Sequence, residues 1–340
     1  MGTESLNLHS EGKGNRLSNE EDIAVRGISQ SGTIRVMACV TKQMVNEMQR
    51  RHHTWPVATA ALGRTSSIAA MMGLMLKGNE RLTIQIKGDG PVGSIVVDAD
   101  AEGRVRGYVE QPFVDLPSNH LGKLDVGGAV GDGMLYVIRD QGLKDYYRGS
   151  AELQTGEIGD DFTYYFAVSE QTPSSVGAGV LVDTDNSVLA SGGFIVQLMP
   201  GYDEEELRQL ETRVANMDSV TNLLMTGLQA EDLLLHVVPG ATVMERKNLT
   251  FHCDCSRHRL RVILKSLGKA ELESLVQDPG YAEVTCHFCG EVYLFEKPEL
   301  AELASELQSL ALSDQASPNE TAAGMHFSDG ESAGLDDTKL

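Results

Sequence analysis

The sequence reads Cys253-Asp-Cys255 and, further on, Cys286-His-Phe-Cys289, and these two short segments organise the C-terminal part of the chain. They hold four of the five cysteines, and 30 residues (256–285) separate them. Each pair can sit on a short turn, and the intervening segment is long enough to fold back and bring the pairs together. Four thiolates at such spacing suit tetrahedral Zn²⁺, which binds sulfur at about 2.3 Å and then has no open position. The sequence therefore predicts one zinc ion held by Cys253, Cys255, Cys286 and Cys289.

A disulfide framework is the alternative use of these cysteines. The chain opens with MGTESLNLHSEGKGNR, which lacks the apolar segment of a secretory signal peptide, and no apolar run is long enough to span a membrane. We therefore expect a cytoplasmic protein, whose thiols are normally kept reduced. Compartment and spacing together favour metal binding over structural disulfides. Cys39 lies in an apolar run and is expected to be a buried bystander.

Length, composition and charge limit the number of domains and the kinds of partner. The chain has 340 residues, a hydrophobic fraction of 41% and a formal net charge of -21. Its length predicts two domains with additional tails, and its apolar content suffices for a core. The negative charge disfavours nucleic acid as a partner, because binding phosphates requires Lys and Arg.

The N-terminal part predicts an α+β domain over residues 23–201, after a disordered leader at 1–22. Short strands alternate with Gly/Asp turns typical of hairpins. The expected strands include Thr33–Val40, Leu82–Lys87, Gly93–Asp98, Arg104–Val109, Met134–Arg139 and Val176–Val182, and helices are expected within Met44–Leu76, broken at Pro56, and at Asp160–Ser169. Met71, Met72 and Met75 share a helix face that is either buried against a sheet or part of an adaptable surface that binds other proteins. The glycine-rich segment 127–133 lacks the Lys-Ser/Thr end of a P-loop, so no nucleotide site is expected.

The C-terminal part divides into three segments. Residues 202–247 predict a helical linker whose amphipathic helices are marginal unless docked. Residues 248–312 predict the zinc module, in which Ser256 caps a helix with a buried stripe of Leu260, Ile263, Leu264 and Leu267. Residues 313–340 predict a disordered acidic tail. The basic cluster Arg257, His258 and Arg259 either offsets the negative charge of a four-thiolate centre or forms a solvated face.

The cysteine set is compatible with two chemical roles. Zinc-bound thiolates are deprotonated, and the thiolate is the form that oxidants attack. A sulfenic acid formed on either cysteine of a pair has a second thiol one or two residues away with which it can condense. Oxidation would then remove the ligands and unfold a small module whose folding depends on the metal. The alternative is an inert structural zinc site.

The sequence resembles the redox-regulated 33 kDa heat-shock chaperones, which are bacterial holdases. The resemblance rests on the Cys-x-Cys and Cys-x-x-Cys spacing and extends over residues 22–312. Further matching blocks occur in family order: Gly32-Thr-Ile-Arg35, Leu82-Thr-Ile-Gln-Ile-Lys-Gly-Asp-Gly-Pro91, Gly103-Arg-Val-Arg-Gly-Tyr108, Ser169-Glu-Gln-Thr-Pro173, Gln197-Leu-Met-Pro-Gly201, Phe251-His-Cys-Asp-Cys-Ser-Arg257 and Glu283-Val-Thr-Cys-His-Phe-Cys-Gly290.

This resemblance implies a chaperone that is not an enzyme. The reduced, zinc-bound form is implied to be folded and inactive. Oxidation is implied to form Cys253–Cys255 and Cys286–Cys289 disulfides, to release zinc and to unfold the linker. The exposed apolar surface then binds unfolding client proteins without ATP, and the oxidised protein can form a homodimer.

Two other functions fit parts of the sequence. One is a binding protein with a static zinc site, which would keep its metal under mild oxidant. The other is a thiol-disulfide oxidoreductase using Cys286 and Cys289. Such a motif usually opens a helix in a βαβ unit, whereas here a hairpin is expected.

Overall fold

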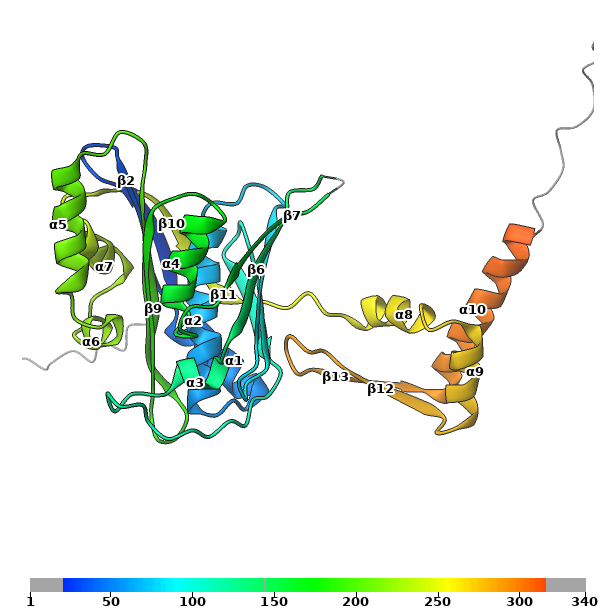
Figure 1. The fold of residues 1–340 in the computed structure, drawn as a ribbon. Helices are drawn as coiled ribbons and strands as arrows, with labels where there is room; N and C mark the ends of the chain where they lie inside the picture. The colour runs from blue at the N-terminus through cyan, green and yellow to red at the C-terminus, as the bar shows by residue number, and fades with distance from the viewer. Residues whose placement is uncertain (1–20, 144, 316–340) are drawn as a thin grey trace, which may run out of the picture. The chain divides into compact units, whose positions relative to one another are not determined.

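A computed structural model describes residues 21–143 and 145–315 of the chain, which form two compact units (Figure 1). Of these residues, the first unit holds those up to Asp254 together with Cys286–Glu291. The second unit holds Cys255–Thr285 and the residues from Val292 onward. Most of the expected leader and tail lies outside the described residues. Asp22, which was expected in the leader, is instead buried, and its carboxylate accepts hydrogen bonds from the first amides of the helix that follows.

The first unit contains a five-stranded antiparallel sheet. Its strand order is β10-β1-β2-β9-β8. Its central strands are buried almost throughout, because successive residues point to opposite faces of the sheet and each face packs on a core of its own. The strands are β1 (Ile23–Ile28), β2 (Ile34–Val40), β8 (Ser174–Val182), β9 (Val188–Leu198) and β10 (Thr242–Asn248).

A six-stranded sheet forms the second layer, in the order β11-β5-β4-β3-β6-β7. Neighbouring strands are antiparallel except for β11, which runs parallel to β5. Every second residue of β3 to β5 is buried, as expected for hairpins with one face on a core. The strands are β3 (Arg81–Gly88), β4 (Ser94–Asp100), β5 (Arg104–Val109), β6 (Gly133–Asp140), β7 (Tyr147–Glu152) and β11 (Thr250–Phe251).

Helix α2 (Pro56–Gly73) packs against strands of both sheets, which explains why it is buried on nearly all sides. Met71 and Met72 are fully buried in this core. The interpretation of this methionine face as sheet packing is therefore confirmed. The other helices of this part are α1 (Lys42–His52), α3 (Val126–Val130) and α4 (Gly159–Val168). Antiparallel sheets with segregated helices confirm the α+β class.

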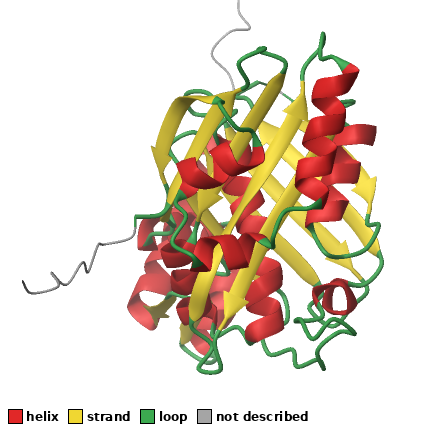
Figure 2. Ribbon diagram, turned by 90° about the vertical axis from the view of Figure 1, so that its left-hand side faces the viewer, coloured by secondary structure: helices red, strands yellow, loops and turns green. Residues whose placement is uncertain are grey.

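Three helices, α5 (Glu204–Ala215), α6 (Val220–Met225) and α7 (Ala230–Val237), cover the other face of the five-stranded sheet. Figure 2 views the molecule from the side on which they lie. They bury an apolar cluster that we call the linker core, with Leu233 and Leu234 fully enclosed. Besides these two, it comprises Ile23, Val25, Ile34, Val36, Ala38, Phe194, Val196, Leu198, Leu210, Val220, Leu223, Ala230, Val237, Val238 and Ala241.

The end of the expected helical linker differs from the prediction. Residues 242–247 belong to strand β10, which pairs antiparallel with β1. The side chains of β10 are exposed or half-buried, so this segment has no apolar stripe of helical spacing. It forms a strand because its backbone pairs with the edge of β1. Strand β1 itself was not expected from the sequence.

Where the structure describes it, the second unit combines a β-hairpin with three helices. Ser256 caps α8, as expected, because its hydroxyl accepts a hydrogen bond from the Arg259 amide at 3.3 Å. Ile263 and Leu267 were expected in the buried stripe of α8 but are 58% and 51% exposed. The elements are α8 (Arg257–Lys265), α9 (Lys269–Gln277), β12 (Tyr281–Thr285), β13 (Val292–Glu296) and α10 (Lys297–Gln315). Within the described part of the chain, no helix is both long and apolar enough to cross a membrane.

Candidate metal centre

Strand β11 carries the first cysteine pair to the edge of the six-stranded sheet. The Thr250 amide donates to the Gly103 carbonyl at 3.0 Å, and the His252 amide donates to the Val105 carbonyl at 3.0 Å. These bonds hold the backbone against β5 up to the residue before Cys253. The position of the first thiol is therefore set by main-chain pairing to a rigid strand.

The second pair lies on the loop between β12 and β13. The Cys286 amide donates to the Glu291 carbonyl at 2.9 Å, and the Gly290 amide donates back to the Cys286 carbonyl at 2.8 Å. Gly290 has φ 71°, a left-handed conformation that glycine adopts without strain. This tight turn places Cys286 and Cys289 on one side of the loop, as the sequence predicted for a metal-binding knuckle.

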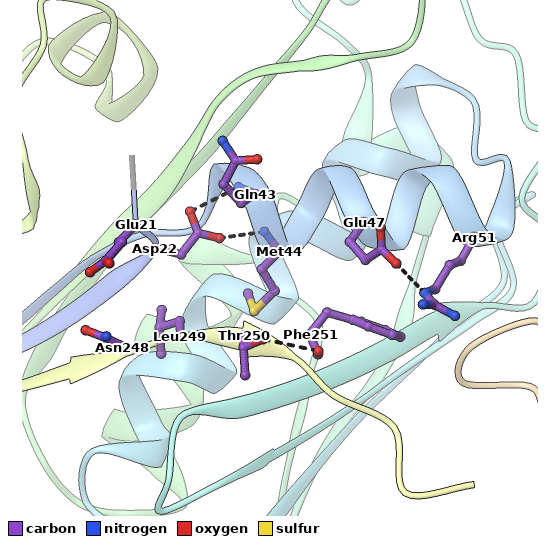
Figure 3. A pocket seen from close by; sticks show the side chains of 10 residues that line it. All are labelled: Glu21, Asp22, Gln43, Met44, Glu47, Arg51, Asn248, Leu249, Thr250 and Phe251. Atoms are coloured by element: carbon purple, nitrogen blue, oxygen red, sulfur yellow. Dashed lines mark hydrogen bonds and ion pairs between the residues drawn. The ribbon is translucent and has the colours of Figure 1, made fainter. Parts of the chain in front are cut away.

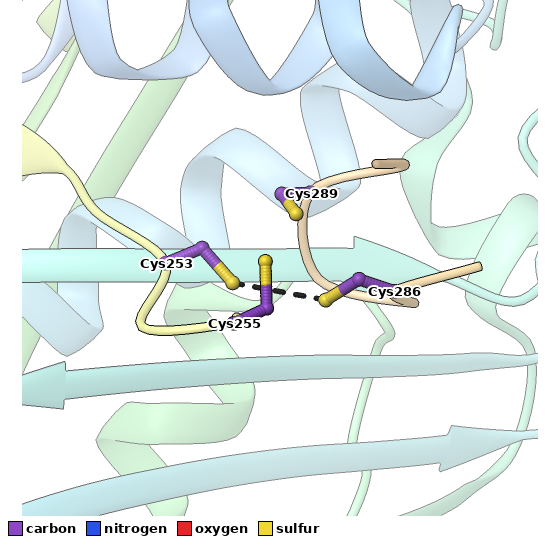
Figure 4. A group of neighbouring side chains, drawn as sticks. All are labelled: Cys253, Cys255, Cys286 and Cys289. Atoms are coloured by element: carbon purple, nitrogen blue, oxygen red, sulfur yellow. Dashed lines mark hydrogen bonds between the residues drawn. The ribbon is translucent and has the colours of Figure 1, made fainter. Parts of the chain in front are cut away.

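The four sulfur atoms converge, and Figure 4 shows their arrangement. All lie within 4.8 Å of one another, and the Sγ atoms of Cys253 and Cys286 are 3.7 Å apart. Two thiolates that bind one ion at about 2.3 Å in a tetrahedron are separated by about 3.8 Å. No disulfide joins any of the cysteines, and Cys289 is buried while the other three are half-buried. The residues present therefore fit a four-thiolate metal centre, and Cys253, Cys255, Cys286 and Cys289 can hold a metal ion.

Two polar side chains surround the cluster. Arg106 on β5 lies with a guanidinium nitrogen 3.7 Å from Cys253 Sγ and also pairs with Asp98 at 2.8 Å. The Tyr293 hydroxyl lies 3.4 Å from Cys255 Sγ. Both groups can donate hydrogen bonds to thiolates. Arg106 could not be recognised as a site residue from the sequence, since its proximity to Cys253 depends on the parallel pairing of β11 with β5.

In the described part of the chain, the bonds of Arg257 go to other residues of the second unit and not to the thiols. Its guanidinium bonds the Glu299 carboxylate and the Leu294 carbonyl, at 2.5 and 2.7 Å, and lies 4.5 Å from the centre of the Phe295 ring. These contacts hold α10 against α8 and β13 within the second unit. A charged group that lies close to the first thiol is the Arg106 guanidinium.

The thiols differ in their surroundings. Cys39 is fully buried, and burial raises the pKa of its thiol well above the usual range, so it stays protonated and unreactive. Cys39 is therefore a buried bystander, as predicted. With no metal bound, burial also raises the pKa of Cys286. A coordinated metal ion has the opposite effect, because a coordinating thiol is deprotonated.

A cavity of about 690 Å³ lies elsewhere in the first unit, between α1 and the β10–β11 segment (Figure 3). Its lining combines Asp22 and Glu47 with Arg51 and includes none of the four clustered cysteines. Asp22 and Glu47 are already engaged, the first with amides of α1 and the second with Arg51. These two carboxylates therefore stabilise helix α1.

Fold and site together define an α+β protein with a C-terminal cluster of four cysteines able to hold a metal. The family model described as Hsp33 protein matches residues 22–296. The chain belongs to the Hsp33 family, and its function is that of a chaperone. This confirms the resemblance found in the sequence.

Individual relatives agree along most of the chain. The 33 kDa chaperonin of Bacillus velezensis is 49% identical over 287 residues, which cover 84% of this chain and 99% of that protein. The 33 kDa chaperonin of Bacillus subtilis is 47% identical with the same coverage. The crystal structure of the 33 kDa chaperonin from Thermotoga maritima matches with a TM-score of 0.80 and 36% identity, covering 85% of this chain and 99% of that one.

Proposed function

We propose that the protein is a redox-regulated, ATP-independent holdase of the cytoplasm and not an enzyme. The observation that carries this proposal is the convergence of four thiols in the part of the chain that follows the helices covering the five-stranded sheet. Its clients are unfolding proteins, and its oxidised form can dimerise. Membership of a family whose relatives are named chaperonins supports the client-binding part.

The metal in this proposal is one zinc ion. Four thiolate ligands favour zinc over hard cations such as Mg²⁺ and Ca²⁺, which prefer oxygen. Bound zinc supplies the positive charge that keeps all four thiols deprotonated at neutral pH. The half-buried positions of Cys253, Cys255 and Cys286 leave these thiolates within reach of a small oxidant.

The redox step is the formation of two disulfides, Cys253–Cys255 and Cys286–Cys289. One thiolate of each pair takes an oxygen atom from peroxide or hypochlorite and becomes a sulfenic acid. The neighbouring thiolate then attacks that sulfur and displaces its hydroxyl group, which leaves with a proton as water. Each pair thus gives two electrons to one oxidant molecule: peroxide and two protons yield two waters, and hypochlorite and two protons yield chloride and one water. Sulfurs joined in disulfides are poor ligands, so the metal is lost.

Loss of the centre is transmitted through the chain that follows the linker helices. Strand β10 has mostly exposed or half-buried side chains and pairs with β1 through its backbone, and β11 ends two residues before Cys253. When the cysteine turn unfolds, this segment loses its C-terminal anchor. The short helices α5 to α7 are then held only by the linker core. Their release exposes a contiguous apolar surface suited to binding many different unfolded chains.

The test uses the reduced, zinc-loaded protein and follows two signals in one sample. The sample is treated with hypochlorite or warm peroxide, and released zinc is measured alongside light scattering from an aggregating client. We expect zinc release to accompany new suppression of scattering, and dithiothreitol with zinc to reverse both. The matched control is Cys39→Ser, which removes a thiol outside the cluster and should respond as the parent does.

Other outcomes point to the alternatives. Retained zinc without suppression would indicate a static structural site. Catalytic turnover of a disulfide substrate would indicate an oxidoreductase, whereas a holdase binds clients stoichiometrically. The position of Cys286 at the end of a strand, in a hairpin loop, differs from the helix-opening cysteine typical of oxidoreductases.

A further inference from the structure

The loop that carries the second cysteine pair is part of the first unit. We call this segment, Cys286–Gly290, the metal loop. Its main-chain carbonyls face the C-terminal end of α1: His52 Nε2 lies 3.1 Å from the Phe288 carbonyl, and an Arg51 guanidinium nitrogen donates to the Cys289 carbonyl at 3.4 Å. The metal loop is thus bonded to a helix more than two hundred positions earlier in the chain.

Two aromatic contacts hold the same loop against β5. The ring of Tyr108 meets the Phe288 ring edge-on at a centroid distance of 5.3 Å and an interplanar angle of 84°. Tyr108 also lies 5.7 Å from the ring of His287. Phe288 lies between the two cysteines of its pair, so these contacts position the loop backbone that carries both thiols.

Arg106 is the residue that joins these contacts to the thiols. Its guanidinium carbon lies 4.1 Å from the centre of the Phe288 ring, and a nitrogen of the same group lies 3.7 Å from Cys253 Sγ. Asp98 on β4 fixes the group with two bonds of 2.8 and 3.0 Å. The Arg106 side chain is only 18% exposed, which strengthens both the cation–π contact and the charge interaction.

We propose that Arg106 is a positioning residue that seats the metal loop on β5 and thereby sets how fast the metal centre opens. The seat consists of Arg106 and Tyr108 from β5 and of Arg51 and His52 from α1. One guanidinium contacts the first thiol and the ring between the second pair, so it fixes both pairs with respect to one rigid strand. The inference rests on the proposed metal centre. It adds residues outside the zinc module that determine how fast the centre loses its metal.

The experiment compares Arg106→Ala with Arg104→Ala in the full-length reduced protein. Arg104 lies on the same strand and loses the same charge, but its bonds go to Asp100 and Glu102. The first measurement is the rate of zinc transfer to a colorimetric chelator at a fixed peroxide dose. We expect roughly tenfold faster release from Arg106→Ala than from the parent, and little change in the control.

Two further variants separate seating from a general loss of fold. Phe288→Leu removes the ring and leaves the sheet intact, so it should accelerate zinc release in the same direction. The double variant Arg106→Ala/Phe288→Leu should accelerate release by less than the product of the two single effects, since the contact between the two residues can be lost only once. Arg106→Lys keeps the charge but loses the planar stack, and it should restore part of the parent rate.

A second measurement does not depend on metal. Chymotrypsin cleavage after Phe288 should be several-fold faster in Arg106→Ala than in Arg104→Ala, because the loop leaves its seat more often. Equal cleavage and equal zinc release in these two variants would overturn the proposal. A parent protein that binds no zinc would refute the metal centre, and cleavage would still decide the seat. If Arg106→Ala changed zinc release and cleavage as expected but oxidant induced no suppression of aggregation in the parent, only the proposed holdase function would be refuted.

Discussion

The Sγ atoms of Cys253 and Cys286 lie 3.7 Å apart, although the residues are 33 positions apart in the chain. This separation is close to the roughly 3.8 Å expected for two thiolates on one tetrahedral zinc ion and far above the 2.05 Å or so of a disulfide. The contact joins one cysteine from each pair. A metal at this point therefore closes the loop that contains α8 and α9.

Replacing Cys286 by serine should disable the centre. Loss of one of four ligands is expected to weaken zinc binding by more than the 10- to 100-fold that changes around the ligands usually cost. The variant should show no oxidant-dependent suppression of client aggregation, because the disulfide between residues 286 and 289 can no longer form. Zinc content by a chelator assay and light scattering check this. A response to oxidant equal to that of the parent would contradict the proposed redox chemistry.

Replacing Leu234 by alanine should loosen the docked linker without touching a cysteine. Leu234 is fully buried and reaches β1, where a Cβ added at Gly27 would lie only 3.3 Å from its methyl carbons. A buried Leu→Ala change costs about 2–5 kcal/mol. We expect the reduced protein to suppress aggregation without oxidant and hydrogen exchange in α5–α7 to accelerate.

The adjacent residue supplies the control for that change. Leu235 is 40% exposed, so Leu235→Ala should leave both signals near those of the parent. If Leu234→Ala exchanged faster in α5–α7 but stayed inactive, the surface under the linker would not be the client site.

The local parts of this structure were predictable from the sequence. Turn residues and alternating patterns predicted the hairpins of β3 to β5, and the cap at Ser256 was recognisable from its position before an apolar periodic segment. The cysteine spacing predicted which four thiols converge. The hairpins and the cap depend on a few neighbouring residues. The cysteine cluster follows from the four ligands that one tetrahedral metal ion requires.

Features that depend on distant partners were missed. Residues 242–247 were assigned to the helical linker, because nothing in their sequence reveals that the edge of β1 is open to them. Ile263 fits the helical stripe of α8, yet the surrounding elements leave it exposed. Arg106 resembles any strand arginine until the parallel pairing of β11 brings Cys253 beside it.

The Glu299–Arg257 pair should make the second unit sensitive to acid. The hydrogen bond from Arg257 is the main reason that the pKa of Glu299 lies below its usual value of 4.5, and Arg261 contributes in the same direction. A carboxyl whose pKa is lowered on folding stabilises the fold above its unfolded pKa, and this contribution is lost as the pH falls through the lower folded value.

Glu299→Gln measures that contribution. At pH 7 it should lower the melting temperature of the second unit by a few degrees, and the difference from the parent should shrink as the pH falls below about 4.5. Glu302→Gln is the control, since Glu302 is 59% exposed and its single bond to Arg261 should contribute little. A difference that stayed constant down to pH 3 would show that the carboxylate charge is not what stabilises this contact.

Removing the metal from the reduced protein should unfold the second unit and leave the six-stranded sheet folded. Among the described residues, the core of this unit has only seven buried apolar side chains, which is too few to stabilise it without a crosslink. A chelator with dithiothreitol removes zinc without forming disulfides. We expect amides of α8–α10 to lose protection from hydrogen exchange while those of β3–β6 keep it. Zinc should restore the protection, and Mg²⁺ should not, because it is a poor partner for thiolates. Protection of α8–α10 that survived chelation would show that this core is sufficient, and the metal could then not be the element that holds the module folded.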